Sequence, residues 1–205
     1  MPGRSAPHGQ RDAQLVDVRP LTRDRLPDLA ALFATTAMTN RCYCTYFLLS
    51  GQEREQVWPA GRARPCFEEF ARSAPAPVGV LAYEDARVVG WCAAAPRRHY
   101  PTVLRSPLHR ERNTAEDGDV WFVSCFYVHR SARHRGLTSR LLDGVVEIAA
   151  SSGALAVEGL PRADGDRVGA LDAYVGAESV FTATGFDVVR RPSPRRVLMR
   201  RNLRS

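Results

Sequence analysis

Residues 120–128 constrain the fold of this chain more than any other segment. They read Val-Trp-Phe-Val-Ser-Cys-Phe-Tyr-Val, and such an apolar run is typical of a strand that is buried on both faces of a sheet. The pattern over 138–150 differs, because its apolar residues recur on one helical face; they are Leu141, Leu142, Val145, Val146 and Ala149. A buried strand followed by an amphipathic helix predicts a sheet with helices packed against it.

The remaining segments alternate between strand and helix patterns. We predict further strands at 14–19, 78–83, 87–95, 154–160, 186–190 and 196–201, and helical regions at 23–33, 52–71 and 170–184. This order predicts a mixed α/β fold, in which antiparallel N-terminal strands lead into a parallel β-α-β unit flanked by helices. Residues 1–13 are rich in Pro, Gly and Arg and are expected to form a flexible tail, whereas 14–205 has the length of a single domain.

The excess positive charge is confined to the C-terminal end. The chain carries 29 Lys plus Arg against 22 Asp plus Glu, a net charge of +7, and every one of these cations is arginine. Residues 190–205 hold seven arginines and no acid, so that residues 1–189 hold 22 of each sign. Nucleic-acid binding draws on a basic surface that is spread over a domain. We therefore expect no nucleic-acid partner.

The composition fits a cytoplasmic globular protein. No apolar run approaches the roughly 20 residues of a membrane span, and residues 1–10 lack the apolar segment of a signal peptide. The five cysteines are an odd number, which is expected of reduced thiols. Cys42 and Cys44 are the only close pair; we expect them to pack as small apolar side chains, with a redox role or contact with substrate as the alternatives. No metal site is predicted, because further ligands at regular spacing are lacking.

A turn with a single glycine follows the buried strand. Gly136 lies between Arg133 and Thr138, immediately before the predicted helix. Glycine allows the backbone to approach a ligand closely, and a helix start presents unpaired N–H groups to an anion. The turn therefore suits a pyrophosphate; the alternative is an arginine-rich turn that faces solvent. Neither a phosphate-binding P-loop nor a dinucleotide fingerprint is present.

Together these segments resemble the GCN5-related N-acetyltransferase (GNAT) superfamily. Arg133 and Gly136 match its motif Arg/Gln-x-x-Gly-x-Gly/Ala, with Thr138 in place of the final Gly or Ala, and 181–186 resembles its helix-end motif aromatic-x-x-x-Gly-Phe. Gly90 falls where the family has a Val-Gly strand. The resemblance covers roughly 15–203. Further features resemble a little-characterised bacterial branch of the superfamily; they are Cys42-x-Cys44, Trp91-Cys92, Glu158-Gly159-Leu160-Pro161 and Tyr174-x-Gly176.

The resemblance implies that acetyl-CoA is the co-substrate and that no metal takes part. The backbone amides of one turn would hold its pyrophosphate; they belong to Arg133, His134, Arg135, Gly136, Leu137, Thr138 and Ser139. In the family the central strand and its parallel neighbour splay apart. By that analogy, backbone groups of Phe126, Tyr127 and Val128 would bind the pantetheine arm and polarise the thioester carbonyl. Phe181 would lie against the cofactor.

Acid and base assignments depart from the family pattern. Phe181 stands where many members have the tyrosine that protonates the leaving thiolate, and phenylalanine cannot donate a proton. Tyr174 and Ser179 are the nearest hydroxyls in the sequence; alternatively the thiolate leaves unprotonated. Glu158 interrupts an apolar strand, so it lies either at a solvated strand end or in the acceptor cleft, where burial would raise its pKa toward that of a useful base. Two further base candidates precede the central strand, namely Glu116 and Asp119.

The implied activity is acetyl transfer to a primary amine of a small molecule, such as a metabolite or an antibiotic. Aromatic residues of the first third of the chain are candidates for lining the acceptor pocket, with helix packing as the alternative; they are Tyr43, Tyr46, Phe47 and Trp58. The loop 97–117, with His99 and Tyr100, could cover that pocket or simply lie on the surface. The alternatives are acetylation of a protein or an aminoacyl-tRNA, and a non-catalytic CoA-binding regulatory module. The resemblance also makes a homodimer plausible.

Overall fold

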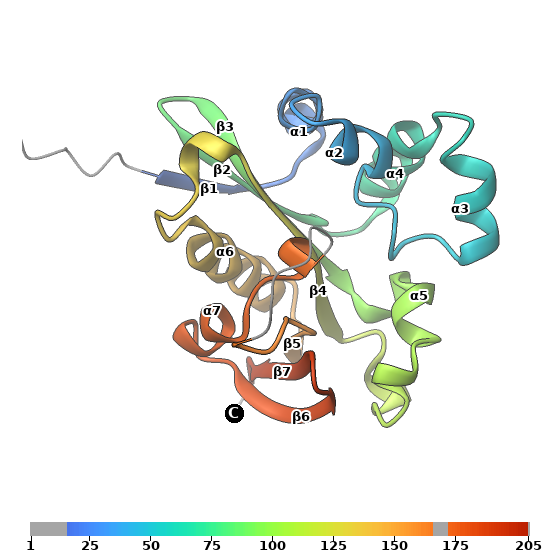
Figure 1. The fold of residues 1–205 in the computed structure, drawn as a ribbon, viewed down its shortest axis with the longest axis vertical. Coiled ribbons are helices and arrows are strands. Elements are labelled where there is room, and N and C mark those ends of the chain that lie inside the picture. Colours follow the sequence, from blue (N-terminus) through green and yellow to red (C-terminus); the bar gives the residue numbers. More distant parts are fainter. Residues whose placement is uncertain (1–15, 166–171, 205) are drawn as a thin grey trace, which may run out of the picture.

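The computed structural model describes residues 16–165 and 172–204. Their centre is a seven-stranded sheet with the order β1-β2-β3-β4-β5-β7-β6 (Figure 1). The strands are β1 (Val16–Pro20), β2 (Gly79–Glu84), β3 (Arg87–Pro96), β4 (Val120–Val128), β5 (Ala156–Gly159), β6 (Asp187–Ser193) and β7 (Arg196–Asn202). All neighbours are antiparallel except β4 and β5, which run parallel. The predicted mixed α/β fold is confirmed.

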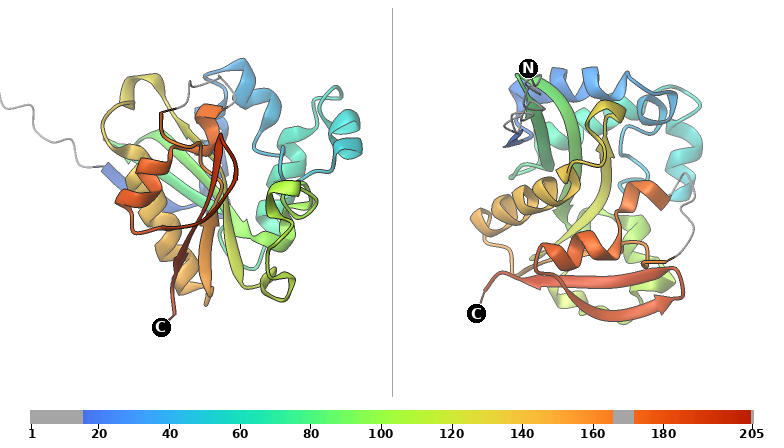
Figure 2. Two further views of the ribbon diagram at one scale, coloured as in Figure 1. Left: turned by 60° about the horizontal axis from the view of Figure 1, so that its bottom comes forward. Right: turned by 60° about the vertical axis from the view of Figure 1, so that its left-hand side comes forward.

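Helices cover both faces of the sheet (Figure 2). One face carries α6 (Leu137–Ser151) and α7 (Glu178–Ala183); the other carries α1 (Leu26–Phe33), α2 (Ala37–Cys42), α3 (Gly51–Val57), α4 (Ala63–Ser73) and α5 (Pro101–Leu104). Short 3-10 turns complete the connections: η1 (Arg23–Arg25), η2 (Arg97–His99), η3 (Pro107–His109), η4 (Thr114–Glu116), η5 (Arg130–Ala132) and η6 (Asp172–Val175). None of the helices in the described ranges is long and apolar enough to cross a membrane.

Each face of the sheet has its own core. Leu141, Leu142 and Val145 of α6 are fully buried against strand residues such as Val123 and Cys92. On the opposite face a largely aromatic cluster surrounds the indole of Trp91, which is 0% exposed. Burial on both faces is the reason that 120–128 reads as a continuous apolar run. β4 and α6 therefore occupy the positions that the sequence predicts for them.

Three segments of the fold differ from the prediction. Helix α2 was missed, because its six residues are too few to show a period. The helical region 52–71 forms two helices, α3 and α4, on either side of Gly61, which has a positive φ; Pro65 lies in the first turn of α4, where a proline is tolerated. The polar connection 96–118 contains α5 and several 3-10 turns. The predicted tail 1–13 and part of the predicted helix 170–184 lie outside the described residues.

Candidate functional site

β4 and β5 separate halfway along β4. Their pairing runs from Val120 to Val123 and stops there. At the same level Ala93 pairs with Cys125 while Ala94 pairs with Val123, so that Ser124 is an extra residue, a β-bulge. A bulge twists its strand, and here it leaves the second half of β4 without a strand on the β5 side.

The unpaired half of β4 presents backbone groups to this opening. The N–H of His129 donates to the carbonyl of Val89 on β3 (2.8 Å). Alternate residues of an antiparallel strand direct their backbone groups to opposite edges. Phe126 and Val128 therefore face away from β3, toward the edge that β5 leaves open. The Val128 carbonyl accepts a hydrogen bond there from the Arg133 side chain (Nε to O, 3.0 Å).

The turn before α6 is open to a ligand. His134 and Gly136 both adopt left-handed conformations, with φ of 60° and 74°, and such turns aim successive N–H groups into a concavity. No side chain caps the helix, so the first-turn amides of Leu137, Thr138 and Ser139 are available. A Cβ added at Gly136 would meet nothing within 4 Å. This turn fits an anionic group such as a pyrophosphate.

Three of the residues predicted to bind the cofactor have side-chain contacts within the protein. Arg135 pairs with Glu84 (2.9 Å) at the edge of the turn. The hydroxyls of Tyr127 and Thr35 hydrogen-bond (2.8 Å), on the face of the sheet that α1 covers. Phe181 is completely buried and packs edge-on against Phe126, with 6.1 Å between the ring centroids.

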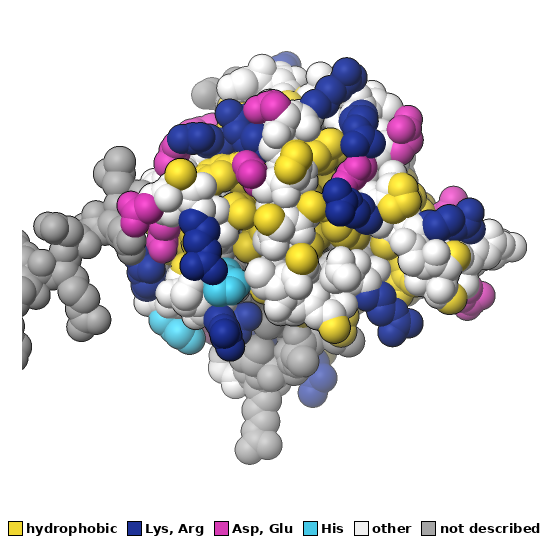
Figure 3. All heavy atoms as spheres, turned by 90° about the horizontal axis from the view of Figure 1, so that it is seen from above, with side chains coloured by type: hydrophobic (Ala, Val, Ile, Leu, Met, Phe, Trp, Pro, Cys, Tyr) yellow, Lys and Arg dark blue, Asp and Glu magenta, His cyan; other side chains and the backbone are white. Residues whose placement is uncertain are grey.

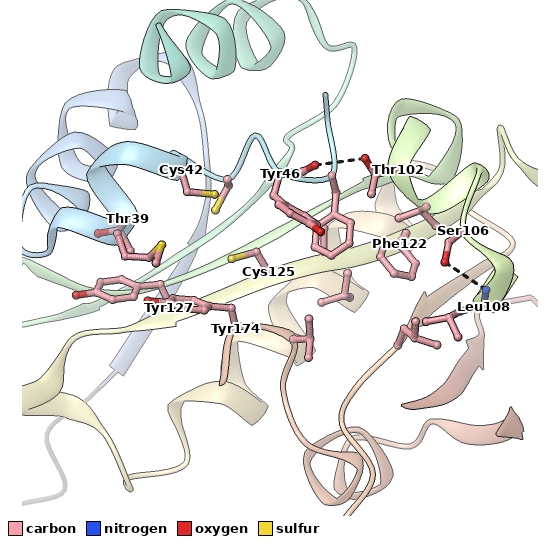
Figure 4. Close-up of a pocket in the computed structure, with 18 of the residues that line it drawn as sticks. Thr39, Cys42, Tyr46, Thr102, Ser106, Leu108, Phe122, Cys125, Tyr127 and Tyr174 are labelled. Carbon is pink, nitrogen blue, oxygen red and sulfur yellow. Dashed lines mark hydrogen bonds between the residues drawn. The ribbon is translucent and has the colours of Figure 1, made fainter. Parts of the chain in front are cut away.

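A cavity of about 670 Å³ lies on the α1 side of β4. Its walls come from α1, α2, the segment 44–47, Trp58 at the end of α3, α5, the segment 106–109, β4, Leu160, η6 and Arg196 of β7. Figure 4 shows Cys125, Tyr127 and Tyr174 together on one side of this space, with Phe122, Ser106 and Leu108 on the other. Seen from the end of the molecule where β4 finishes, apolar side chains gather in the middle of the face among arginines (Figure 3).

Three of the four predicted aromatic residues line this cavity: Tyr46, Phe47 and Trp58. The fourth, Tyr43, is instead buried in the core against Phe33. Cys42 and Cys44 also border the cavity. Burial raises the pKa of the Cys42 thiol to about 11 and that of Cys44 well above its usual value, so both remain protonated. Among the described residues, no group of three or more His, Cys, Asp or Glu could hold a metal ion.

The loop 97–117 contributes to the cavity through residues other than those predicted. His99 packs on Phe70 and Tyr100 is buried in the core, whereas His109 lines the cavity and is 1% exposed. Neither nitrogen of His109 has a hydrogen-bond partner. Burial, together with neighbouring arginines, lowers the pKa of His109 to about 4.

Glu158 lies in a buried ion-pair network away from the cavity lining. Its two oxygens bind Arg97 Nη1 (2.6 Å) and Arg200 Nη1 (3.0 Å). Arg97, which is 1% exposed, also binds Asp117 (2.7 Å), and Arg200 binds Glu116 (2.9 Å). This network joins the loop 97–117 to β5 and β7, which is a structural role. The remaining base candidate, Asp119, is exposed at the start of β4.

The two candidate hydroxyls are separated by the structure. Tyr174 lines the cavity beside Cys125 and Tyr127 (Figure 4). Burial raises the pKa of its phenol, which therefore stays protonated and can donate. Ser179 is exposed at the start of α7, where its hydroxyl donates to Asp164 (3.2 Å), and it does not line the cavity.

His109, Thr102 and Ser106 are three polar cavity residues that sequence reasoning missed. Each lies in the loop 97–117, whose length alone indicated a function. The spacing of these residues has no recognisable pattern, because α5 and the following 3-10 turns fold them back onto β4. His109, Thr102 and Ser106 come together only because the fold places this loop next to the aromatic residues of 44–58.

A parallel strand pair that splays beside an open glycine turn is the arrangement that the resemblance to the GNAT superfamily implies. The model of the Acetyltransferase (GNAT) family matches residues 43–174, more than half of the chain. The chain therefore belongs to this family, as the motifs around Gly136 and Gly185 predict, and it is an enzyme of the N-acyltransferase class.

Solved structures with a similar fold are acetyltransferases. An N-acetyltransferase from Staphylococcus aureus Mu50 has a TM-score of 0.55 at 14% identity, covering 93% of this chain and 99% of that one. The GNAT domain of S. lividans PAT has a TM-score of 0.51 at 16% identity (91% and 89%). The PaiA N-acetyltransferase from Thermoplasma acidophilum, in complex with coenzyme A, has a TM-score of 0.50 at 12% identity (92% and 99%). At these identities the likeness is one of fold. A search of curated proteins found no match.

Proposed function

We propose that the protein transfers the acetyl group of acetyl-CoA to the primary amine of a small molecule. The observation that carries this proposal is the cavity of about 670 Å³ on β4, directly beside the point where β4 leaves β5. Its volume lies within the range of small-molecule pockets, ~300–1,000 Å³. A peptide or a tRNA end is better served by an open groove.

The chain's own groups fit coenzyme A on the opposite side of β4. The first-turn amides of α6, from Leu137 to Ser139, hold the pyrophosphate together with the left-handed turn at Gly136. The outward-facing backbone groups of Phe126 and Val128 pair with the amides of the pantetheine arm. Bound acetyl-CoA supplies an acetyl group activated as a thioester, and a backbone N–H in the splay polarises its carbonyl.

Groups on the cavity side of β4 carry out the proton transfers. As the C–N bond forms and the C–S bond breaks, Tyr174 donates its proton to the leaving sulfur. The attacking nitrogen releases its surplus proton to solvent, from which the Tyr174 phenolate regains one. Phe181 is buried and cannot donate, and Ser179 is bonded to Asp164 outside the cavity. Both oxygens of Glu158 are held by arginines, so this carboxylate does not act as the base. The apolar cavity itself lowers the pKa of a buried ammonium, which delivers the amine in its neutral form.

The test is steady-state kinetics with acetyl-CoA and a panel of amines, with CoA release followed by a thiol reagent. We expect turnover, a loss of about 100-fold in kcat for Tyr174→Phe, and an unchanged KM for acetyl-CoA. Ser179→Ala is the matched control, because it removes a nearby hydroxyl that does not line the cavity. An unchanged kcat in Tyr174→Phe would refute the acid assignment.

Other outcomes distinguish the alternatives. Binding of CoA without turnover on any amine would overturn the proposal in favour of a non-catalytic regulatory module. Turnover on peptide amines or aminoacyl-tRNA, with none on small amines, would overturn the acceptor class. The expectations of a homodimer, of a cytoplasmic location and of no nucleic-acid partner stay predictions; light scattering and salt-dependent binding assays test the first and the last.

A further inference from the structure

A row of aromatic rings forms one wall of the cavity. From Trp58 the row continues through Tyr46, Phe47 and Phe122 to His109, with successive ring centroids 6.3, 5.0, 6.3 and 5.1 Å apart. All five residues line the cavity. Aromatic rings attract a further ring at such spacings, about 4.5–7 Å. A wall of this kind selects an apolar, preferably aromatic, body.

The charge of the cavity is of one sign. Arg41 and Arg196 line it, and no Asp or Glu is among the described residues that do so. A polycationic amine requires a carboxylate for each ammonium that it buries, because an unpaired buried charge is strongly unfavourable. The cavity therefore disfavours polyamines and aminoglycosides.

Among the described residues that line the cavity, His109 is a polar side chain whose buried atoms have no hydrogen-bond partner. Both ring nitrogens are buried without a hydrogen bond, and leaving such a group unpaired is costly. The charged groups that face it are Arg97 of η2, Arg112, Asp117 and Arg190 of β6. With three cations and one acid around it, the imidazole is neutral and has one N–H donor and one lone pair that no protein group uses.

His109 and the reacting end of the cavity are separated along β4. His109 stacks on Phe122, while Tyr174 lies near Cys125 at the opposite side of the space (Figure 4). Phe122 and Cys125 are three positions apart on β4, a distance of about 10 Å. A benzene ring with a two-carbon aminoalkyl chain and a hydrogen bond at its far end spans a comparable length.

Resting on the proposed function, we propose that the acceptor is an amine carried on an aromatic body, and that His109 binds a hydrogen-bonding group at the far end of this body. The amine then lies near Tyr174, the ring lies along the aromatic wall, and the distal hydroxyl or carbonyl satisfies the buried imidazole. His109 is a specificity residue, remote from the reacting atoms.

The experiment uses three probes: tyramine, 2-phenylethylamine, which lacks only the hydroxyl, and spermidine as the polycation. Their Kd values are measured by calorimetry on the CoA-saturated protein, and kcat and KM with acetyl-CoA are measured separately. We expect tyramine to bind about tenfold more tightly than 2-phenylethylamine, the factor of one net hydrogen bond. Spermidine is expected to bind more weakly than either.

His109→Phe keeps an aromatic ring of similar size and removes the hydrogen bond. We expect it to raise the Kd and KM of tyramine about tenfold, to leave 2-phenylethylamine within twofold, and to leave kcat unchanged. His99→Phe is the matched control, because His99 lies in the same loop outside the cavity. If His109→Phe does not fold, His109→Asn is used in its place. Asn retains a donor and an acceptor, so we expect this variant to prefer tyramine less strongly than the wild type does.

The outcomes separate the two proposals. An unchanged preference for tyramine in His109→Phe, or in a folded His109→Asn, overturns the role of His109, and tighter binding of spermidine overturns the acceptor class. Selective binding of tyramine without acetyl transfer supports the acceptor class while overturning the proposed reaction.

Discussion

The buried imidazole of His109 makes the stability of the fold depend on pH. Burial and the positive charges of Arg97, Arg190 and Arg112 lower its pKa to about 4, with Asp117 opposing them. In the unfolded chain a histidine titrates near 6.5. The unfolded state therefore binds more protons between pH 6.5 and 4, so the contribution of His109 to stability is complete above pH 6.5 and is lost as the pH falls.

The magnitude follows from the difference between the two pKa values. One pKa unit is worth about 1.4 kcal/mol, so a shift from about 6.5 to about 4 lowers the free energy of unfolding by ~3 kcal/mol once His109 is protonated in both the folded and the unfolded state. At pH 5 about 2 kcal/mol of this is already lost. The side chain is 1% exposed, so solvent screening is small.

The assay is urea unfolding of the wild type and of His109→Phe at pH 7, 6 and 5. Other titrating groups contribute equally to both proteins, including the half-buried His99, whose pKa burial also lowers. We expect the wild type to lose about 2 kcal/mol more than the variant between pH 7 and pH 5. Parallel stability curves for the two proteins would refute the reasoning, as would an imidazole NMR titration of His109 with its midpoint near 6.5.

Three further predictions concern the fold and the cofactor side. Glu158→Gln should destabilise the protein by about 3–5 kcal/mol in urea unfolding, because it breaks a buried ion pair. Its kcat should stay within a few-fold of the wild-type value. A stable variant with a kcat reduced 100-fold would instead identify Glu158 as the base. In Gly159→Ala the new Cβ would lie 2.3 Å from Phe181, so we expect a loss of about 1–3 kcal/mol that Phe181→Leu partly reverses, and equal additive losses would contradict this contact. Thr138→Glu should stabilise α6 by ~0.3–1 kcal/mol through the helix dipole and yet raise the KM for acetyl-CoA at least tenfold; an unchanged KM would place the pyrophosphate elsewhere.

The elements around the cofactor side could be predicted from the sequence because their signals are local. The run 120–128 is apolar except at Ser124 because both of its faces are buried, and the period of α6 follows from one buried stripe. Gly136 marks the turn because its left-handed conformation favours glycine. These are properties of consecutive residues, so they are visible without the tertiary structure.

The acceptor side could be predicted only in part, because its residues come from distant segments. The sequence identified Tyr46, Phe47 and Trp58 as a group of aromatic residues. It could not separate them from Tyr43, an aromatic residue of the same segment that lies in the core. His109 joins them only after α5 folds the long loop across β4. The ion pairs of Glu158 were equally hidden, since a lone acid in an apolar strand reads the same way whether it faces a cleft or a buried arginine.

The arginines of the C-terminal segment, which carry the net charge of the chain, form ion pairs with earlier segments and also reach the acceptor cavity. Several of them pair with acids contributed by earlier segments, as Arg200 does with Glu158 and Glu116, and Arg191 with Glu178. The local excess of +7 is thereby distributed into ion pairs that fasten β6 and β7 to the rest of the fold. Arg196 also lines the cavity. A strand that closes the sheet thus also places a cation in the cavity wall, so an acceptor whose far end is neutral or anionic is electrostatically favoured over one that carries a second ammonium.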